Sequence, residues 1–234
     1  MAILEKKEIV RWSKMGPRVM FGQFMLELAQ TDLDIIVMSA DLGRSSGLDR
    51  FKKHFPEKYI SVGISEQNLI GVAAGLAKEG HKVFVTSFAP FLSMRASEQI
   101  RMNLGYMELG VNVVALGSGL SMGFLGNSHY GLEDLAIMRA IPNLNVSSPA
   151  DCLELKKILF DYAYNNRGGS YIRLTGIPGS PLTYENDYEY EFSKPIVINE
   201  DEDILIIGTG SILGECKIAV ELLLEHKVKA KLLN

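Results

Sequence analysis

The chain has 234 residues, 47% of them hydrophobic and 22% charged, which is typical of a globular protein with one sizeable core. A net charge of -4 argues against nucleic acid as a partner, because neutralising phosphates requires a basic face. There is no run of about 18 apolar residues and no secretory signal at the N-terminus, so neither a membrane span nor export is expected.

Two cysteines, Cys152 and Cys216, lie far apart and show no paired spacing. We interpret them as free thiols of a reducing compartment, which predicts a cytoplasmic protein. Neither has a neighbouring cue for a nucleophilic thiolate.

Short apolar runs alternate with stretches of helical spacing along the chain. The predicted strands are 34–42, 59–64, 82–88, 111–119, 144–149 and 170–175. The predicted helices between them are 17–30, 65–80 with Ser65 as N-cap, 94–107, 132–141 and 151–165. Continuous apolar strands separated by helices predict an α/β fold, with a parallel β-sheet flanked by helices.

The composition changes at residues 176–200, which are rich in proline, acids and tyrosine. This composition indicates a linker. Residues 203–234 then show a strand, a glycine turn, a helix and a strand. Two strands and one helix cannot bury a core alone, so we expect the start of a second, incomplete α/β domain. The predicted domains are 1–176 and 203–234, joined by a linker at 177–202.

The junction SVGISEQNLIGVAAGLAKEG joins a buried strand directly to a helix, and Glu66 is the first helical residue. A helix N-terminus favours an ionised carboxylate at that position. Glycines and alanines give this helix a small-sided face that suits close packing against a sheet or another subunit. From spacing alone, a capping acid is the more ordinary interpretation of Glu66.

GISEQN followed by this glycine- and alanine-rich helix resembles the cofactor-glutamate segment of thiamine-diphosphate enzymes. That family includes transketolases, deoxyxylulose-phosphate synthases and the β-subunits of 2-oxoacid dehydrogenases. The resemblance covers residues 11–234 and includes SADL (39–42), TSFAPF (86–91), HYGLEDLAIMRAIPN (129–143) and SPAD (148–151). It implies a pyrimidine-binding (Pyr) domain, in which Glu66 hydrogen-bonds the aminopyrimidine of thiamine diphosphate and so promotes ionisation of the thiazolium.

The resemblance also implies further cofactor contacts. Phe88 and Phe91 match phenylalanines that pack on the aminopyrimidine ring, although core packing is the ordinary interpretation of strand phenylalanines. Asp41 and Leu42, in SADL, are likewise implied to contact the cofactor.

Substrate contacts are implied at four residues. His129, in a glycine-rich loop, would face the reacting centre and hydrogen-bond substrate oxygens as a catalytic residue. Arg18 and Arg173 match transketolase arginines that hold the sugar phosphate, and Ser45 matches a phosphate-binding serine. Without the resemblance, His129 and Arg18 are surface residues and Arg173 belongs to a structural ion pair.

The chain also departs from the transketolase pattern. Leu125 replaces an aspartate and Gly117 replaces a histidine, which points to a modified or branched sugar phosphate, a sulfosugar or another ketose. The GDG-plus-Asn motif that holds Mg²⁺ or Ca²⁺ with the diphosphate is absent, so no metal ligand is expected here. An N-terminal transketolase subunit is the expected partner that supplies this site, in a homodimer or an α₂β₂ assembly.

These features identify the chain as a member of the transketolase family, and specifically predict a split C-terminal subunit. Such a transferase would move a two-carbon ketol unit between sugar phosphates or related ketoses and aldoses. Two alternatives stay open: a deoxyxylulose-phosphate synthase or 2-oxoacid dehydrogenase β-subunit, and a non-catalytic assembly subunit.

Overall fold

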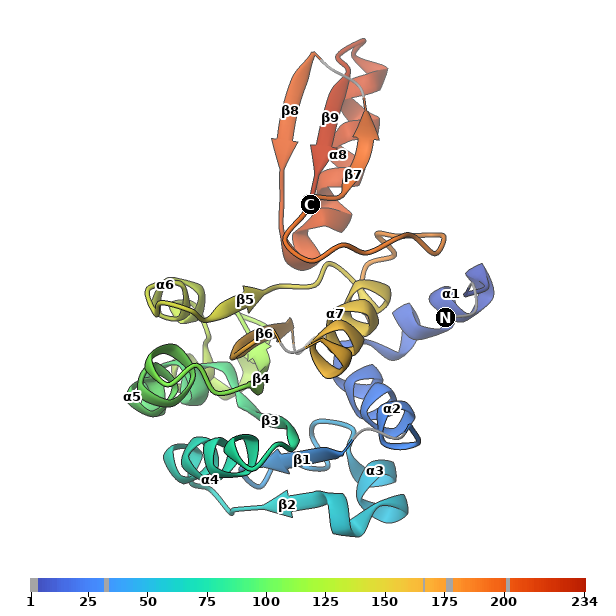
Figure 1. Ribbon diagram of the computed structural model, residues 1–234. Helices are drawn as coiled ribbons and strands as arrows, with labels where there is room; N and C mark the ends of the chain where they lie inside the picture. The colour runs from blue at the N-terminus through green and yellow to red at the C-terminus, as the bar shows by residue number, and fades with distance from the viewer. Residues whose placement is uncertain (1–3, 32–33, 166, 176–178, 201–202) are drawn as a thin grey trace.

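The computed structural model describes residues 4–31, 34–165, 167–175, 179–200 and 203–234. A six-stranded sheet with helices on both faces forms the larger part, and a three-stranded sheet with one helix follows it (Figure 1). The predicted parallel sheet flanked by helices is confirmed. Among the described residues, no helix has the length and apolar character needed to cross a membrane.

The main sheet has the strand order β2-β1-β3-β4-β6-β5, and every pairing in it is parallel. Its central strands are buried along their length, which is why they read as continuous apolar runs. All six predicted strands are confirmed: β1 (Ile35–Ser39), β2 (Tyr59–Ser61), β3 (Lys82–Phe88), β4 (Val111–Ser118), β5 (Asn145–Ser147) and β6 (Ser170–Thr175).

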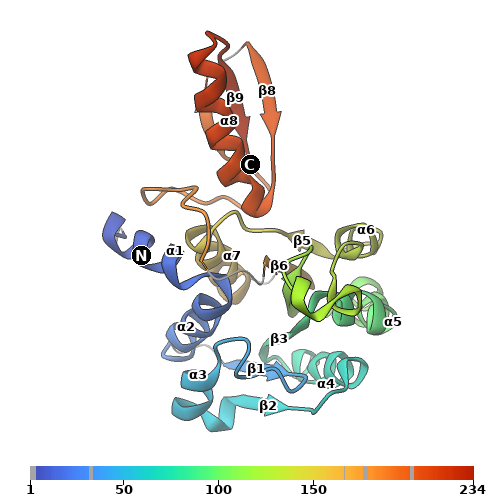
Figure 2. The ribbon, with the colours of Figure 1, turned by 180° about the vertical axis from the view of Figure 1, so that it is seen from behind.

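Helices α1, α2, α3 and α7 cover one face of this sheet, and α4, α5 (Ser97–Ile100) and α6 cover the other (Figures 1 and 2). The predicted helices correspond to α2 (Pro17–Ala29), α4 (Glu66–Lys78), α6 (Asp134–Arg139) and α7 (Cys152–Tyr164). The structure also has two helices that the sequence does not predict, α1 (Lys6–Met15) and α3 (Asp49–His54). Short 3₁₀ turns lie at Pro56–Lys58, Gly123–Leu125, Asn127–His129 and Gly210–Ile212.

The predicted helix 94–107 is not one regular helix. It is divided into the π-helical segments η2 (Phe91–Arg95) and η3 (Arg101–Tyr106), with the short α5 (Ser97–Ile100) between them. A π-helical turn inserts an extra residue and rotates the side chains that follow, so α-helical spacing misplaces them. This matters for Arg95, the last residue of η2.

The smaller sheet has the order β7-β9-β8, with β7 (Val197–Glu200) antiparallel and β8 (Ile204–Ile207) parallel to β9 (Ala230–Leu233). Helix α8 (Leu213–Glu225) packs on β9. Strand β7 was not expected, because it lies inside the segment interpreted as a linker. The domain boundaries themselves remain a prediction.

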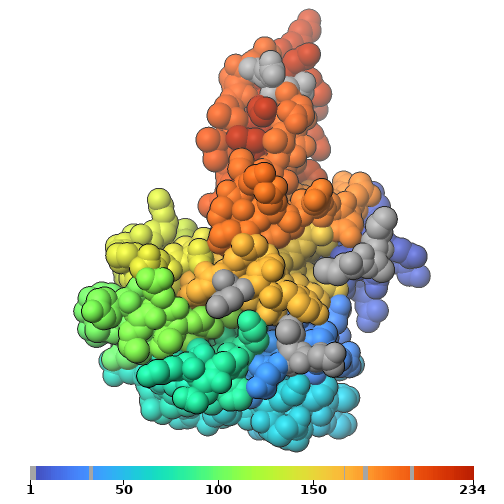
Figure 3. All heavy atoms as spheres, in the orientation of Figure 1, coloured from blue at the N-terminus to red at the C-terminus, as the bar shows by residue number. Residues whose placement is uncertain are grey.

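Hydrogen bonds at the N-terminus of α7 connect the main sheet to the segment that leads into the smaller sheet. Asp151 caps this helix by accepting hydrogen bonds from the backbone N–H groups of Leu153 and Glu154 at 3.0 Å. Its other oxygen accepts from the N–H groups of Thr183 (3.1 Å) and Tyr184 (2.8 Å). The SPAD segment therefore ties the main sheet to the chain that leads into the smaller one, which rises from it in Figure 3.

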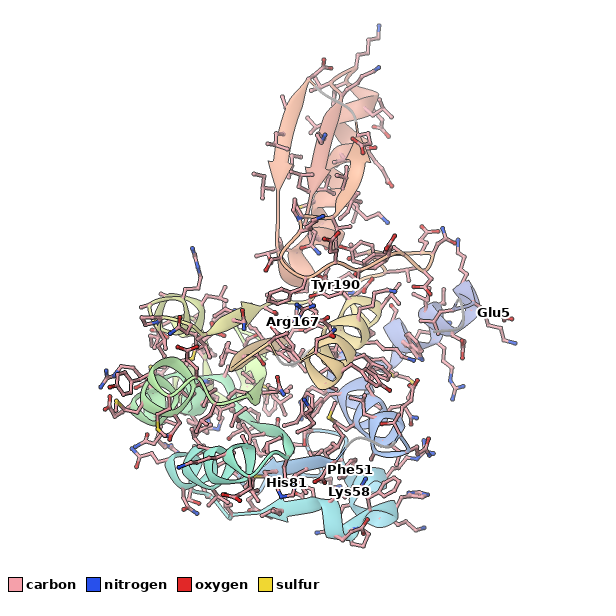
Figure 4. The ribbon with its side chains drawn as sticks, viewed as in Figure 1. Glu5, Phe51, Lys58, His81, Arg167 and Tyr190 are labelled. Carbon is pink, nitrogen blue, oxygen red and sulfur yellow. The ribbon has the colours of Figure 1, made fainter. Side chains whose placement is uncertain are left out.

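Two further contacts strengthen this junction. Glu154 accepts hydrogen bonds from the Ala150 N–H at 2.7 Å and from Nδ2 of Asn234 at 2.9 Å. At the far end of α7, Arg167 is held by Asp161 and lies beside Tyr190 (Figure 4). Both ends of α7 thus contact the segment that follows β6.

Glu154 generates a prediction on stability. Burial raises the pKa of Glu154 to about 7 from an ordinary value of 4.5, against its hydrogen bonds, while Asp151 and Tyr184 also face it. A carboxyl with a raised folded-state pKa contributes its full stability below pH 4.5 and loses it as the pH rises to about 7. This corresponds to a loss of about 3 kcal/mol across that window.

We therefore expect Glu154→Gln to become more stable relative to the wild type as the pH rises from 4.5 to 8. Urea unfolding at several pH values measures the difference between the two free energies of unfolding. Glu191→Gln, which removes an exposed carboxylate paired with Lys194, is the matched control. A difference that is constant with pH would contradict the prediction.

Candidate active site

Glu66 is a buried carboxylate at the start of α4, with only 2% of its surface exposed. Its Oε1 accepts a hydrogen bond from Oγ of Ser87 at 3.1 Å, and its Oε2 accepts from Nη1 of Arg95 at 2.7 Å. Ser65 occupies the N-cap position as predicted, but its hydroxyl donates to the Val62 carbonyl and does not cap the helix.

A cavity of about 220 Å³ lies against this carboxylate. It forms where the strands β1 and β3 end, together with the loop before α4 and the loop after β4. Ligand sites of parallel α/β sheets are found at this carboxyl edge. The lining residues are Ala40, Asp41, Leu42, Ile64, Glu66, Ser87, Phe88, Phe91 and His129.

Three rings form the aromatic wall of the cavity. Phe88 and Phe91 lie 6.0 Å apart between centroids, and the imidazole of His129 packs edge-on at 5.4 and 5.1 Å from them. Nδ1 of His129 lies 3.0 Å from Oγ of Ser128. The cavity therefore has an apolar wall, one buried acid and one imidazole.

The loop that carries His129 is closed by a two-way backbone bridge between Gly119 and Gly131. Beneath it, fully buried Asp134 accepts hydrogen bonds from Nε of Arg173 at 2.9 Å and from the hydroxyl of Tyr171 at 3.1 Å. Arg173 is therefore ion-paired, and it does not line the 220 Å³ cavity.

Arg18 and Ser45 are in contact, through the Arg18 side chain and the Ser45 backbone. Nε and Nη2 of Arg18 donate to the main-chain carbonyl of Ser45 at 2.9 and 2.6 Å. Partial burial lowers the pKa of Arg18. Neither residue lines the cavity.

Gly117 and Leu125, the two departures from the family pattern, differ in their surroundings. Gly117 has φ of 70°, and a Cβ there would lie 2.5 Å from Cγ of Met122. A side chain at this position would require Met122 to move. Leu125 is 39% exposed and lies outside the cavity lining.

Two partners of Glu66, Ser87 and Arg95, are not predicted by the sequence. Strand alternation could have placed Ser87 on the α4 side, because Val83 and Val85 of the same strand belong to the core on that side. No such signal existed for Arg95, whose direction depends on the π-helical turn. Among the described residues, no cluster of three or more His, Cys, Asp or Glu side chains could hold a metal ion.

Comparison with known proteins identifies the family. The family model for "Transketolase, pyrimidine binding domain" matches residues 13–176. The chain is 38% identical, over 94% of its length, to the putative transketolase C-terminal section of Methanocaldococcus jannaschii. It is 36% identical, over 92% of its length, to the 6-deoxy-6-sulfo-D-fructose transketolase subunit SqwH of Clostridium sp. (strain MSTE9).

The chain spans about two thirds of these relatives, 69% of the first and 66% of the second. A solved structure described as "Split gene transketolase, inactive beta4 tetramer" superposes with a TM-score of 0.84 at 35% identity. That match covers 94% of this chain and 71% of the other. The chain therefore belongs to the transketolase family, whose pyrimidine-binding domain it carries at residues 13–176.

Proposed function

We propose that this chain is the pyrimidine-binding subunit of a split, thiamine-diphosphate-dependent transketolase. The observation that carries the proposal is the buried carboxylate of Glu66 against a cavity walled by Phe88, Phe91 and His129. The names of the relatives support the split arrangement, since they denote a C-terminal section and a subunit.

The cavity residues fit an aminopyrimidine ring. Glu66 can accept a hydrogen bond from a protonated ring nitrogen, and burial prevents water from competing for it. Phe88 and Phe91 offer apolar surface to the ring and exclude water, and Asp41 and Leu42 also line the cavity. Bound thiamine diphosphate would supply a thiazolium that stabilises a carbanion.

His129 is the proposed catalytic residue on the substrate side. Because Nδ1 faces Ser128, Nε2 is the ring nitrogen left to hydrogen-bond a substrate oxygen in the cavity. Arg18, Ser45 and Arg173 remain proposed as ligands of an anionic group on the sugar. The relatives' names support a ketose of this kind, since they mention 6-deoxy-6-sulfo-D-fructose and apulose-4-phosphate.

The proposal is tested by a substrate panel on this chain with a GDG-containing partner subunit. Transfer of a two-carbon ketol unit from a ketose to an aldose is the expected reaction. Carbon dioxide release from pyruvate would instead favour a deoxyxylulose-phosphate synthase or a 2-oxoacid dehydrogenase β-subunit. A deoxyxylulose-phosphate synthase is also among the relatives at 33% identity. No turnover with any donor would favour the non-catalytic alternative.

Glu66→Gln keeps the size of the side chain but removes its charge. We expect turnover of the complex to fall by about 10²-fold or more, the usual contribution of a positioned acid or base. Circular dichroism checks that the fold is retained. Glu98→Gln, which removes an exposed partner of Arg101, should leave turnover unchanged, whereas near-normal turnover by Glu66→Gln would refute the role of Glu66.

The chain alone should bind thiamine diphosphate weakly and show no turnover, because we assign the cation and diphosphate to the partner subunit. The inactive tetramer of the split-gene relative supports this expectation. Calorimetry with Mg²⁺ or Ca²⁺, before and after addition of the partner subunit, measures it. Tight metal-dependent binding by the chain alone would contradict it.

Helix α4 offers a surface for the partner. Gly71 and Gly75 face open space, with nothing within 4 Å of an added Cβ, and Val72 is 38% exposed. Nearby, Ile64 at the cavity is 77% exposed. We propose that this face of α4 contacts the partner subunit closely.

Gly71→Leu and Gly75→Leu separate folding from assembly. Each should stabilise the isolated chain, by up to about 1 kcal/mol, because glycine is unfavourable inside a helix and the space is open. Each should also weaken association with the partner, measured by analytical ultracentrifugation. Lys7→Leu, which adds an exposed leucine to α1, is the control. Unchanged association of both glycine variants with the partner would exclude this face as the contact.

A further inference from the structure

Arg95 joins the two chemically different walls of the cavity. Its Nη1 donates to Oε2 of Glu66 at 2.7 Å, and its guanidinium lies 4.2 Å from the centroid of the Phe91 ring. One planar cation therefore contacts both the buried acid and an aromatic residue of the proposed pyrimidine slot. A lysine ammonium could not satisfy both with the same geometry, since it lacks a planar face.

The position of Arg95 is itself fixed by α4. Nε2 of Gln67 donates to the backbone carbonyl of Arg95 at 3.0 Å. Glu66 and Gln67, two consecutive residues of the first turn of α4, thus hold the side chain and the backbone of the same residue. The π-helical segment η2 and the start of α4 are locked together by this reciprocal pair of contacts.

The Glu66 carboxylate depends on Ser87 and Arg95 for its hydrogen bonds inside the protein. A carboxylate that is 2% exposed has lost nearly all its hydration, so its charge must be compensated by partners within the protein. Ser87 supplies one neutral hydrogen bond, and Arg95 supplies the charged one. Each donor engages a different oxygen, so together they determine how the carboxylate plane is turned toward the cavity.

Resting on the proposed function, we infer that Arg95 is a positioning residue. It orients the Glu66 carboxylate and the Phe91 ring as one unit, and so determines how well the aminopyrimidine is seated. Arg95 does not line the cavity, so it acts through these two residues and not through direct contact with the substrate.

The first measurement tests the contact in the full chain without any cofactor. Unfolding free energies of wild type, Arg95→Met, Glu66→Gln and the double variant form a double-mutant cycle. We expect a clear coupling, with Arg95→Met less destabilising when Glu66 has already been neutralised. Arg101→Met, in the exposed pair of Arg101 with Glu98, provides the matched control and should show no coupling to Glu66.

The second measurement uses the complex with the partner subunit. We expect Arg95→Met to weaken thiamine diphosphate binding and lower kcat by about 10- to 100-fold, as for loss of a hydrogen bond to a charged group. The KM for the ketose should stay within about threefold, because Arg95 does not touch the substrate. Arg95→Lys should restore part of both losses, and Arg101→Met should match the wild type.

The outcomes separate the two proposals. If Glu66→Gln is inactive but Arg95→Met has normal kcat and cofactor affinity, the positioning role is overturned and the proposed function stands. If Glu66→Gln is itself fully active, the proposed function fails, while the double-mutant cycle still reports on the contact. Should Arg95→Met fail to fold, Arg95→Lys carries the test, and wild-type affinity and kcat in that variant would overturn the role.

Discussion

The burial of one carboxylate constrains most of the candidate site. The buried Glu66 has a donor at each of its oxygens, one neutral and one charged, and such partners offset the loss of hydration. One donor comes from the end of β3 and the other from the π-helical segment after it. The same stretch of chain places Phe88 and Phe91 on the cavity wall, so the end of β3 and its continuation supply both the donors to the acid and the aromatic slot.

Two further buried acids, Asp151 and Glu154 at the start of α7, connect the two sheets. Asp151 satisfies four backbone N–H groups, two on its own helix and two on the chain beyond β6. Glu154 reaches Asn234, which follows the last strand. The bonds to Thr183, Tyr184 and Asn234 join residues far apart in sequence, and they connect the smaller sheet to the α7 end of the main one.

The sequence predicts the features that depend on local pattern. The six strands of the main sheet were found because burial on both faces leaves continuous apolar runs. Strand β7 was missed because its pairing with β9 is a long-range contact inside a polar, proline-containing segment. The sequence predicts a regular helix at 94–107 because nothing in its spacing marks the π-helical turns.

The candidate site likewise has residues that the sequence predicts and residues that only the structure reveals. Motif resemblance brought Glu66, Phe88, Phe91 and His129 together, and the structure places them around one cavity. It could not reveal Arg95, whose guanidinium direction depends on backbone geometry. Nor could it show that Arg18 donates to the Ser45 backbone carbonyl and not to its hydroxyl.

In the proposed function, recognition of the substrate is assigned to the arginines. Leu125 and Gly117 supply no polar side chain, and packing against Met122 disfavours one at position 117. Arg173 is oriented by Asp134, and Arg18 by the Ser45 carbonyl. A guanidinium whose direction is already fixed loses less entropy when it binds an anion, so these bonds would preorganise the two side chains for a sugar phosphate or sulfonate. Glu66 and the two arginines are thus held by separate hydrogen-bond networks. In the proposed function, this separation would allow the sugar to vary while the Glu66 arrangement stays unchanged.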